Sequence, residues 1–68
     1  MDTKQIQYYN DSIRYCNKLL ALLDKEKDTI RNCFRGEPLQ VYLSATDEAI
    51  NRTKMIRKAL ETLQVMQT

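Results

Sequence analysis

Several residue types that carry strong chemistry are absent or rare in this chain of 68 residues. It has no histidine and no tryptophan, and only two cysteines, one glycine and one proline. Tetrahedral zinc sites draw most of their ligands from cysteine and histidine, so a metal site is not expected. General acid–base catalysis relies most often on histidine, and so short a chain has little room for a walled pocket. We therefore expect a protein that is not an enzyme and that has no cofactor, no metal and no small-molecule substrate.

Net charge and long apolar runs are scarce as well. Eleven Lys and Arg residues exceed nine Asp and Glu residues by a net charge of only +2, which is too little to indicate a nucleic-acid partner. The longest apolar run, at positions 19–23, is far below the roughly 18 residues that a membrane span needs. The first residues mix polar and apolar types, unlike a cleavable leader. We expect a cytoplasmic chain without membrane insertion, which can be exported together with a partner.

One place in the chain carries turn signals. Gly36 and Pro38 are the sole glycine and proline, two residues apart. Glycine tolerates the left-handed conformation at which helices end, and proline suits the first turn of the next helix. Strand signals are weak, because no alternating run of β-branched or aromatic residues extends beyond a few positions. The sequence predicts an all-α fold with one domain over 1–68, an antiparallel hairpin with a helix at about 4–35, a turn at 36–37 and a helix at about 38–66.

Both predicted helices carry an apolar seam. In the first, apolar residues recur at steps of three and four, as in a heptad repeat, with Lys27 as the polar interruption; they are Ile6, Tyr9, Ile13, Cys16, Leu20, Leu23, Ile30 and Phe34. In the second, smaller residues form the corresponding face: Tyr42, Ala45, Ala49, Thr53, Ile56, Leu60 and Leu63. On the exposed side of the second helix, Glu48 precedes Arg52 by four residues, the favourable order for an ion pair. The two seams predict that the helices pack against each other.

A second apolar strip lies beside each seam. On the first helix it comprises Tyr8, Tyr15, Leu19, Leu22 and Cys33, and on the second Leu39, Leu43 and Ile50. With the seam, the strip covers about half of the first helix, whereas one partner helix covers only about two positions in seven. A single hairpin would leave the strip exposed as a contiguous apolar patch, which is typical of interaction sites. We therefore expect the hairpin to associate into a four-helix or larger assembly, as a homodimer or with the helices of another protein.

The turn and its surroundings resemble a known family. Phe34-Arg35-Gly36 has the form aromatic-x-Gly. Between two amphipathic helices it resembles the turn of the small WXG-type hairpins of type VII secretion, with Phe34 where that family carries tryptophan. The family's Tyr-x-x-x-Asp/Glu secretion signal is missing, since Tyr42 is followed four residues later by Thr46. The chain is more similar to the WXG-like companions encoded beside LXG-domain toxins in Gram-positive bacteria. This resemblance implies a targeting or chaperone-like partner that binds the N-terminal helical region of a larger effector.

The second strip supplies the candidate contacts with such effector helices. They are Tyr8, Tyr15, Leu19, Leu22, Leu39, Leu43 and Ile50, with Phe34 and Gly36 as the turn motif. Phe34 either plugs the tip of the hairpin or is an ordinary apolar cap on the turn.

Other interpretations stay open. One alternative is a homodimeric four-helix structural or regulatory module without a secretion role. Another is an anion or nucleic-acid binder that uses the basic residues at positions 52, 54, 57 and 58, although on a helix these spread over more than one side. The two halves could also straighten into one long helix across Gly36, since hairpins of this kind can exchange.

Overall fold

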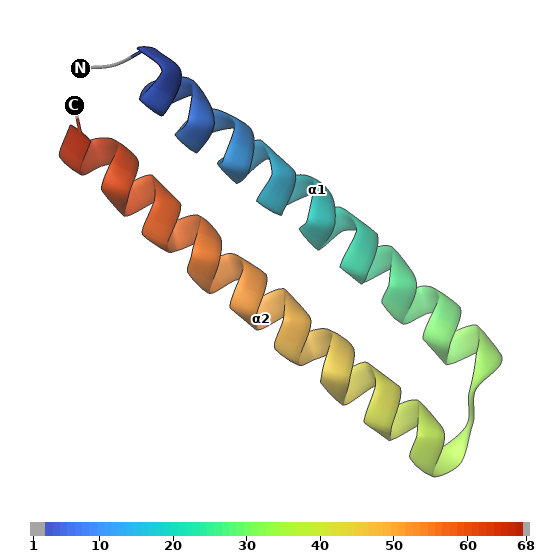
Figure 1. The fold of residues 1–68 in the computed structure, drawn as a ribbon. Helices are drawn as coiled ribbons and strands as arrows, with labels where there is room; N and C mark the ends of the chain where they lie inside the picture. Colours follow the sequence, from blue (N-terminus) through green and yellow to red (C-terminus); the bar gives the residue numbers. More distant parts are fainter. Residues whose placement is uncertain (1–2, 68) are drawn as a thin grey trace.

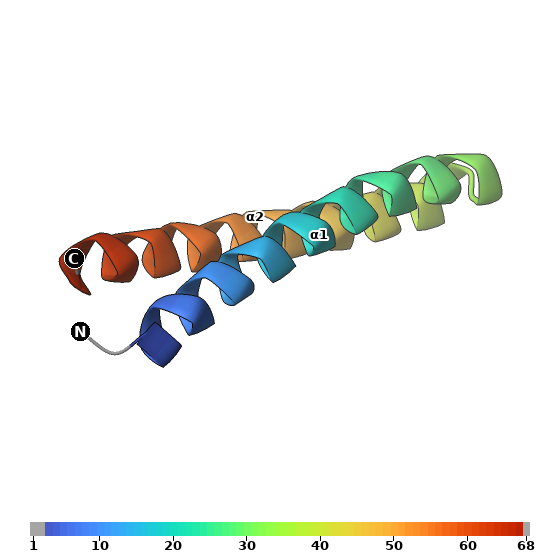
Figure 2. The same cartoon turned by 90° about the horizontal axis from the view of Figure 1, so that it is seen from above.

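The chain forms two long helices that run antiparallel side by side (Figure 1). In the computed structural model, which describes residues 3–67, helix α1 spans Thr3–Cys33 and helix α2 spans Gly36–Gln67. The rod measures 52 × 14 × 10 Å, and the helices cross at a shallow angle when seen from above (Figure 2). The all-α antiparallel hairpin predicted from the sequence is confirmed, and its association into a four-helix assembly stays a prediction.

The break between the helices lies at residues 34–35, about two residues earlier than the sequence predicted. The N–H of Phe34 donates the last hydrogen bond of α1 to the carbonyl of Ile30, at 3.0 Å. The guanidinium of Arg35 then donates to the carbonyls of Arg31 at 2.7 Å and of Phe34 at 2.8 Å. Because the Arg35 side chain satisfies these carbonyls, α1 ends without a further backbone turn. Gly36 follows with a φ of 68°, the left-handed conformation expected of this glycine.

Three polar contacts between the helices define a single register. Asn17 Oδ1 accepts a hydrogen bond from Arg57 at 2.7 Å, Lys27 Nζ lies 2.7 Å from Asp47 Oδ1, and Gln64 donates to Asn10. From Asn10 to Asn17 to Lys27, α1 advances by the same numbers of residues by which α2 goes back from Gln64 to Arg57 to Asp47. The register of the two helices is therefore the same at all three contacts. Asn10 and Asn17 lie one heptad apart and so on the same side of α1, which is the polar side of the hairpin, whereas Lys27 lies in the seam.

The seam of α1 packs as predicted. Cys16 and Ile30 are buried. The other seam residues are half-buried, except Ile6 near the start of the helix, which is 36% exposed. Lys27 also lies in the seam, with 22% of its side chain exposed, and extends to Asp47. A heptad pattern of apolar residues thus indicates correctly which face of α1 meets α2.

The seam of α2 differs from the predicted one. Buried or half-buried residues of α2 recur at steps of three and four: Leu39, Leu43, Thr46, Ile50, Thr53, Arg57, Leu60 and Gln64, with Ala49 beside them. Of the predicted seam, Thr53 and Leu60 lie in this set and Ala49 is half-buried, whereas Tyr42, Ala45, Ile56 and Leu63 are exposed. The predicted seam of α2 was therefore wrong, because the observed seam lies about one residue position further around the helix.

Local hydrogen bonds explain how polar residues can occupy that seam. Thr46 and Thr53 donate their hydroxyls to carbonyls four residues earlier in α2, at 2.8 and 2.7 Å. Arg57 and Gln64 reach the asparagines of α1. Because each of these polar groups has a partner, its burial carries little penalty. The apolar core is small in consequence, since Cys16, Ile30 and Ile50 are its only buried apolar residues among those described.

Candidate interaction face

The hairpin has two unlike long sides. On one side α1 and α2 meet through the polar contacts of Asn10 and Asn17 described above. On the other side, Tyr8, Ser12 and Tyr15 of α1 and Ile56 and Leu60 of α2 line a shared groove. Since a helix places residues three and four apart on one face, further apolar residues at this spacing continue the same side along each helix. We call this side the apolar face and define it by Tyr8, Tyr15, Leu19 and Leu22 on α1 and Ile56, Ala59, Leu63 and Met66 on α2.

The apolar face is exposed to a degree that is unusual for such large side chains. Tyr8, Tyr15 and Leu22 are 62%, 67% and 63% exposed, and Leu19 beside them is half-buried. These four predicted contact residues of α1 therefore lie on one face and remain accessible. Their spacing of seven residues from Tyr8 to Tyr15 to Leu22 aligns them in one row along the helix.

The three predicted contact residues of α2 lie elsewhere. Ile50 is only 8% exposed, and Leu39 and Leu43 are half-buried, all within the seam against α1. Their predicted place on a free strip is wrong, because the contacts between the helices set a register that turns this face of α2 toward α1. Their contact with a partner stays a prediction.

The residues that take their place on α2 were assigned to the seam by sequence reasoning. Ile56 is 56% exposed, Leu63 is 42% exposed and Met66 is 74% exposed. The register in which α2 pairs with α1 could have placed them correctly. Lys27 in the seam of α1 needs an acidic partner, and pairing it with Asp47 turns Ile50 inward and Ile56 outward.

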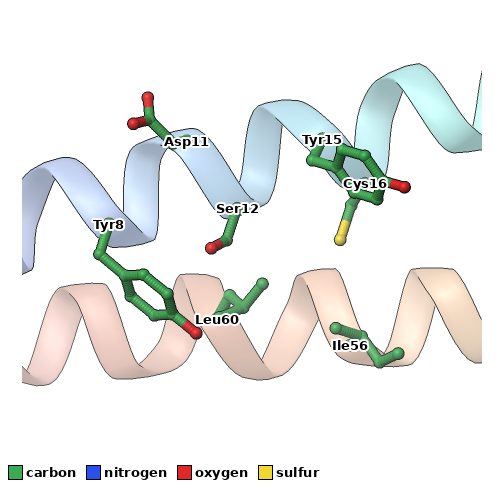
Figure 3. Close-up of a pocket in the computed structure, with 7 residues that line it drawn as sticks. All are labelled: Tyr8, Asp11, Ser12, Tyr15, Cys16, Ile56 and Leu60. Carbon is green, nitrogen blue, oxygen red and sulfur yellow. The ribbon is translucent and has the colours of Figure 1, made fainter.

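Figure 3 shows the centre of the apolar face. A groove of about 430 Å³ lies between the helices, lined by Tyr8, Asp11, Ser12, Tyr15, Cys16, Ile56 and Leu60. The ring of Tyr8 extends from α1 toward α2, where Leu60 and Ile56 lie, whereas the carboxylate of Asp11 points away from α2. Tyr8 also meets Tyr9 edge to face, with ring centroids 5.5 Å apart. The groove is thus built from aromatic and aliphatic surface with polar groups at its rim.

Four exposed charged residues lie nearer the turn. Lys25 and Glu26 follow Leu22 on α1, and Glu48 and Arg52 precede Ile56 on α2. None of these four residues takes part in the four ion pairs of the described chain, which join Asp11–Arg14, Lys27–Asp47, Asp28–Arg31 and Arg57–Glu61. The Glu48–Arg52 pair expected from the sequence is therefore not formed.

The turn motif packs locally. Phe34 is half-buried and its ring lies 4.6 Å from that of Tyr42, at an angle of 36°. Gly36 has open space where a Cβ would stand, so its positive φ alone restricts substitution there. The contact with Tyr42 makes Phe34 an apolar cap that closes the tip of the hairpin.

The face offers binding surface and little reactive chemistry. Within residues 3–67 no group of His, Cys, Asp and Glu side chains could hold a metal ion. Over the same range no helix is both long and apolar enough to cross a membrane. No protein family, curated protein or solved structure matches the chain. The resemblance to WXG-type hairpins therefore stays a prediction.

Proposed function

We propose that this chain is a protein-interaction module, half of a four-helix bundle whose apolar face takes up two further helices. The single observation that carries the proposal is the exposure of Tyr8, Tyr15 and Leu22 in one row beside Ile56, on a hairpin with few buried residues. A core this small supplies only a few kcal/mol, and small domains usually gain the remainder from a partner chain. Covering the apolar face would provide that remainder.

The resemblance to WXG-like companions suggests one source of the further helices. On this proposal they belong to the N-terminal helical region of a larger secreted effector, and the hairpin acts as its targeting or chaperone-like partner. An amphipathic helix docks in such a groove through apolar residues at helical spacing. The aromatic residues Tyr8 and Tyr15 are the expected anchors, because tyrosine is enriched among residues that dominate binding energy.

The second candidate function is a homodimeric structural or regulatory module. The specific observation in its favour is the four charged residues near the turn that have no ion-pair partner within the described chain.

The experiment that tests the interaction face does not depend on the identity of its occupant. Tyr15→Glu places a charge on the apolar face, and Ala21→Glu places the same charge on an exposed position of α1 that faces away from it. Light scattering and circular dichroism across a dilution series would follow both variants. We expect the unmodified chain and Ala21→Glu to associate alike, and Tyr15→Glu to disperse. A fully helical monomer at every concentration, unchanged by Tyr15→Glu, would exclude a binding face.

A further inference from the structure

The two seams are out of phase with each other across the turn. On α1 the seam ends at Phe34, which is half-buried. The same alternation of steps of three and four would continue at positions 37 and 41. The seam of α2 begins instead at Leu39 and Leu43, which are half-buried and come two residues later in each case. The chain therefore has two residues too many between the seams for one uninterrupted helix with a single apolar face.

This offset rotates one seam away from the other. An α-helix turns by about 100° per residue, so two extra residues correspond to about 200°. If the chain were one straight helix, the seam of α2 would lie on nearly the opposite side of that helix from the seam of α1. In the hairpin both seams face inward, because the break at residues 34–35 and the left-handed Gly36 reverse the direction of the chain.

A straight helix would bring different residues of α2 into line with the seam of α1. All of them are exposed in the hairpin, and six of the nine are polar or charged: Glu37, Val41, Ser44, Glu48, Asn51, Met55, Lys58, Thr62 and Val65. If two straight chains paired in the register of the hairpin, Lys58 would lie level with Cys16 of the second copy. An ammonium group would then face a buried apolar position, which is costly without a partner.

We propose that the offset between the seams keeps the chain a closed hairpin, because it prevents the exchange of α2 between two copies through one continuous helix. Exchange of an identical element is otherwise an easy route from a hairpin to a dimer. Here the exchanged pair would lose the seam of α2 and the three polar contacts that define the register. Gly36 and Pro38 also disfavour a helix across the turn, but the offset acts whatever residues stand there.

The offset also determines how a partner meets the chain. The groove between Tyr8 and Tyr15 of α1 and Ile56 and Leu60 of α2 exists only while the two helices lie side by side (Figure 3). In a straight chain the two halves of the apolar face would lie far apart along one helix. An occupant of the apolar face therefore adds helices to an intact hairpin and does not take the place of α2. Nothing in the offset depends on what that occupant is.

The distance between the two ends of one chain tests the proposal. Gln7 and Gln67 are exposed, and the register places them level with each other. Fluorophores at Gln7→Cys and Gln67→Cys, in a Cys16→Ala, Cys33→Ala background, should be separated by little more than the roughly 10 Å between packed helices. One continuous helix would separate them by about 90 Å, at 1.5 Å per residue. A trace of doubly labelled chain, refolded with an excess of unlabelled chain, reports the energy transfer within one chain only.

Two variants separate the offset from the local preferences of the turn. Gly36→Ala with Pro38→Ala removes both helix-disfavouring residues and keeps the offset. Deletion of Arg35 and Gly36, together with Pro38→Ala, also removes both residues but brings the two seams into phase. We expect the first variant to keep the high energy transfer of the unmodified chain. We expect the second to lose most of its energy transfer and to form a helical dimer, because one continuous seam can then pair with a second copy.

The opposite results would overturn the proposal. Low energy transfer in the unmodified chain, or in the variant with Gly36→Ala and Pro38→Ala, would mean that a straight helix forms in spite of the offset. High energy transfer in the deletion variant, or loss of its helix content in circular dichroism, would mean that the phase of the seams does not decide between hairpin and straight helix. The effect of Tyr15→Glu on association tests the apolar face separately, so that a failure of the two proposals can be told apart.

Discussion

Two isoleucines of α2 provide a matched test of the packing. Ile50 is 8% exposed in the seam against α1, and Ile56 is 56% exposed on the apolar face. Both lie in the middle of the same helix, so the small gain in helix propensity on replacement by alanine is equal at the two positions. Any difference in the free energy of unfolding therefore reports on burial alone.

The magnitude follows from the exposed fractions. Replacing Ile by Ala removes three carbons, each worth roughly 0.8 kcal/mol when fully buried. Ile50→Ala should therefore cost about 2 kcal/mol from lost burial, and a cavity in the seam adds to this. Ile56→Ala should cost about 1 kcal/mol in the isolated hairpin, and it leaves no cavity because the site is open. With an m-value of about 1 kcal/mol per molar urea for so small a chain, the two midpoints should differ by about 1 M or more.

The assay is urea unfolding followed by circular dichroism, at a concentration where light scattering shows a monomer, or in the Tyr15→Glu background if the unmodified chain stays associated. Met55→Ala, at a residue that is 71% exposed, serves as the control for helix propensity and should shift the midpoint little. Equal losses for Ile50→Ala and Ile56→Ala, or a larger loss for Ile56→Ala, would show that α2 packs through the other face and would refute the register. At high concentration the cost of Ile56→Ala should rise toward that of Ile50→Ala if the apolar face becomes covered.

Three further substitutions test the turn and the seam. Gly36→Ala should lower the free energy of unfolding by about 1 kcal/mol, because φ is positive there while the space around the residue is open. Gly36→Asn should cost less. Equal midpoints for glycine and alanine in urea unfolding would contradict this prediction. Lys27→Met should leave the free energy of unfolding within about 1 kcal/mol of the original or raise it, since an apolar side chain replaces a partly desolvated ammonium. Asp47→Ala should cost more, because it leaves Lys27 unpaired. If Lys27→Met cost more than Asp47→Ala, that order would be evidence against the ion pair. Phe34→Ala should lower the thermal midpoint through loss of its ring contact with Tyr42, worth about 1 kcal/mol beyond the buried area, and an unchanged melting curve would mean that the tip does not contribute.

The sequence was sufficient for the fold and for α1. A single Gly36 and a single Pro38 in the whole chain allow only one sharp break, so two long helices were the simplest outcome. On α1 the seam is apolar at every heptad position except Lys27, whereas the second strip beside it has no apolar residue between Leu22 and Cys33. Tyr8, Tyr15 and Leu22 could therefore be placed outside the seam from periodicity alone, as the structure confirms.

The orientation of α2 could not be obtained in this way. Its seam includes Thr46, Thr53, Arg57 and Gln64, whose polar groups are satisfied by hydrogen bonds that a hydropathy pattern does not contain. Its exposed face is at least as apolar as its seam. Hydrophobicity therefore favoured the wrong face, and only a pairing of specific residues across the two helices could have corrected it.

The same inversion is the strongest physical reason to treat the hairpin as incomplete. A helix that buries Thr53 and half-buries Arg57 within its own chain, while it exposes Ile56 and Leu63, is more apolar outside than an isolated hairpin requires. The polar groups in the seam fix the register of the two helices but add little to the free energy of unfolding, because each hydrogen bond contributes only about 1 kcal/mol net. On the proposed function, the larger apolar side chains are covered by a second interface, which would supply most of the remaining burial. If so, helix content and association should be lost together on dilution, whereas a hairpin that unfolds with no dependence on concentration would mean that the seam alone holds the fold.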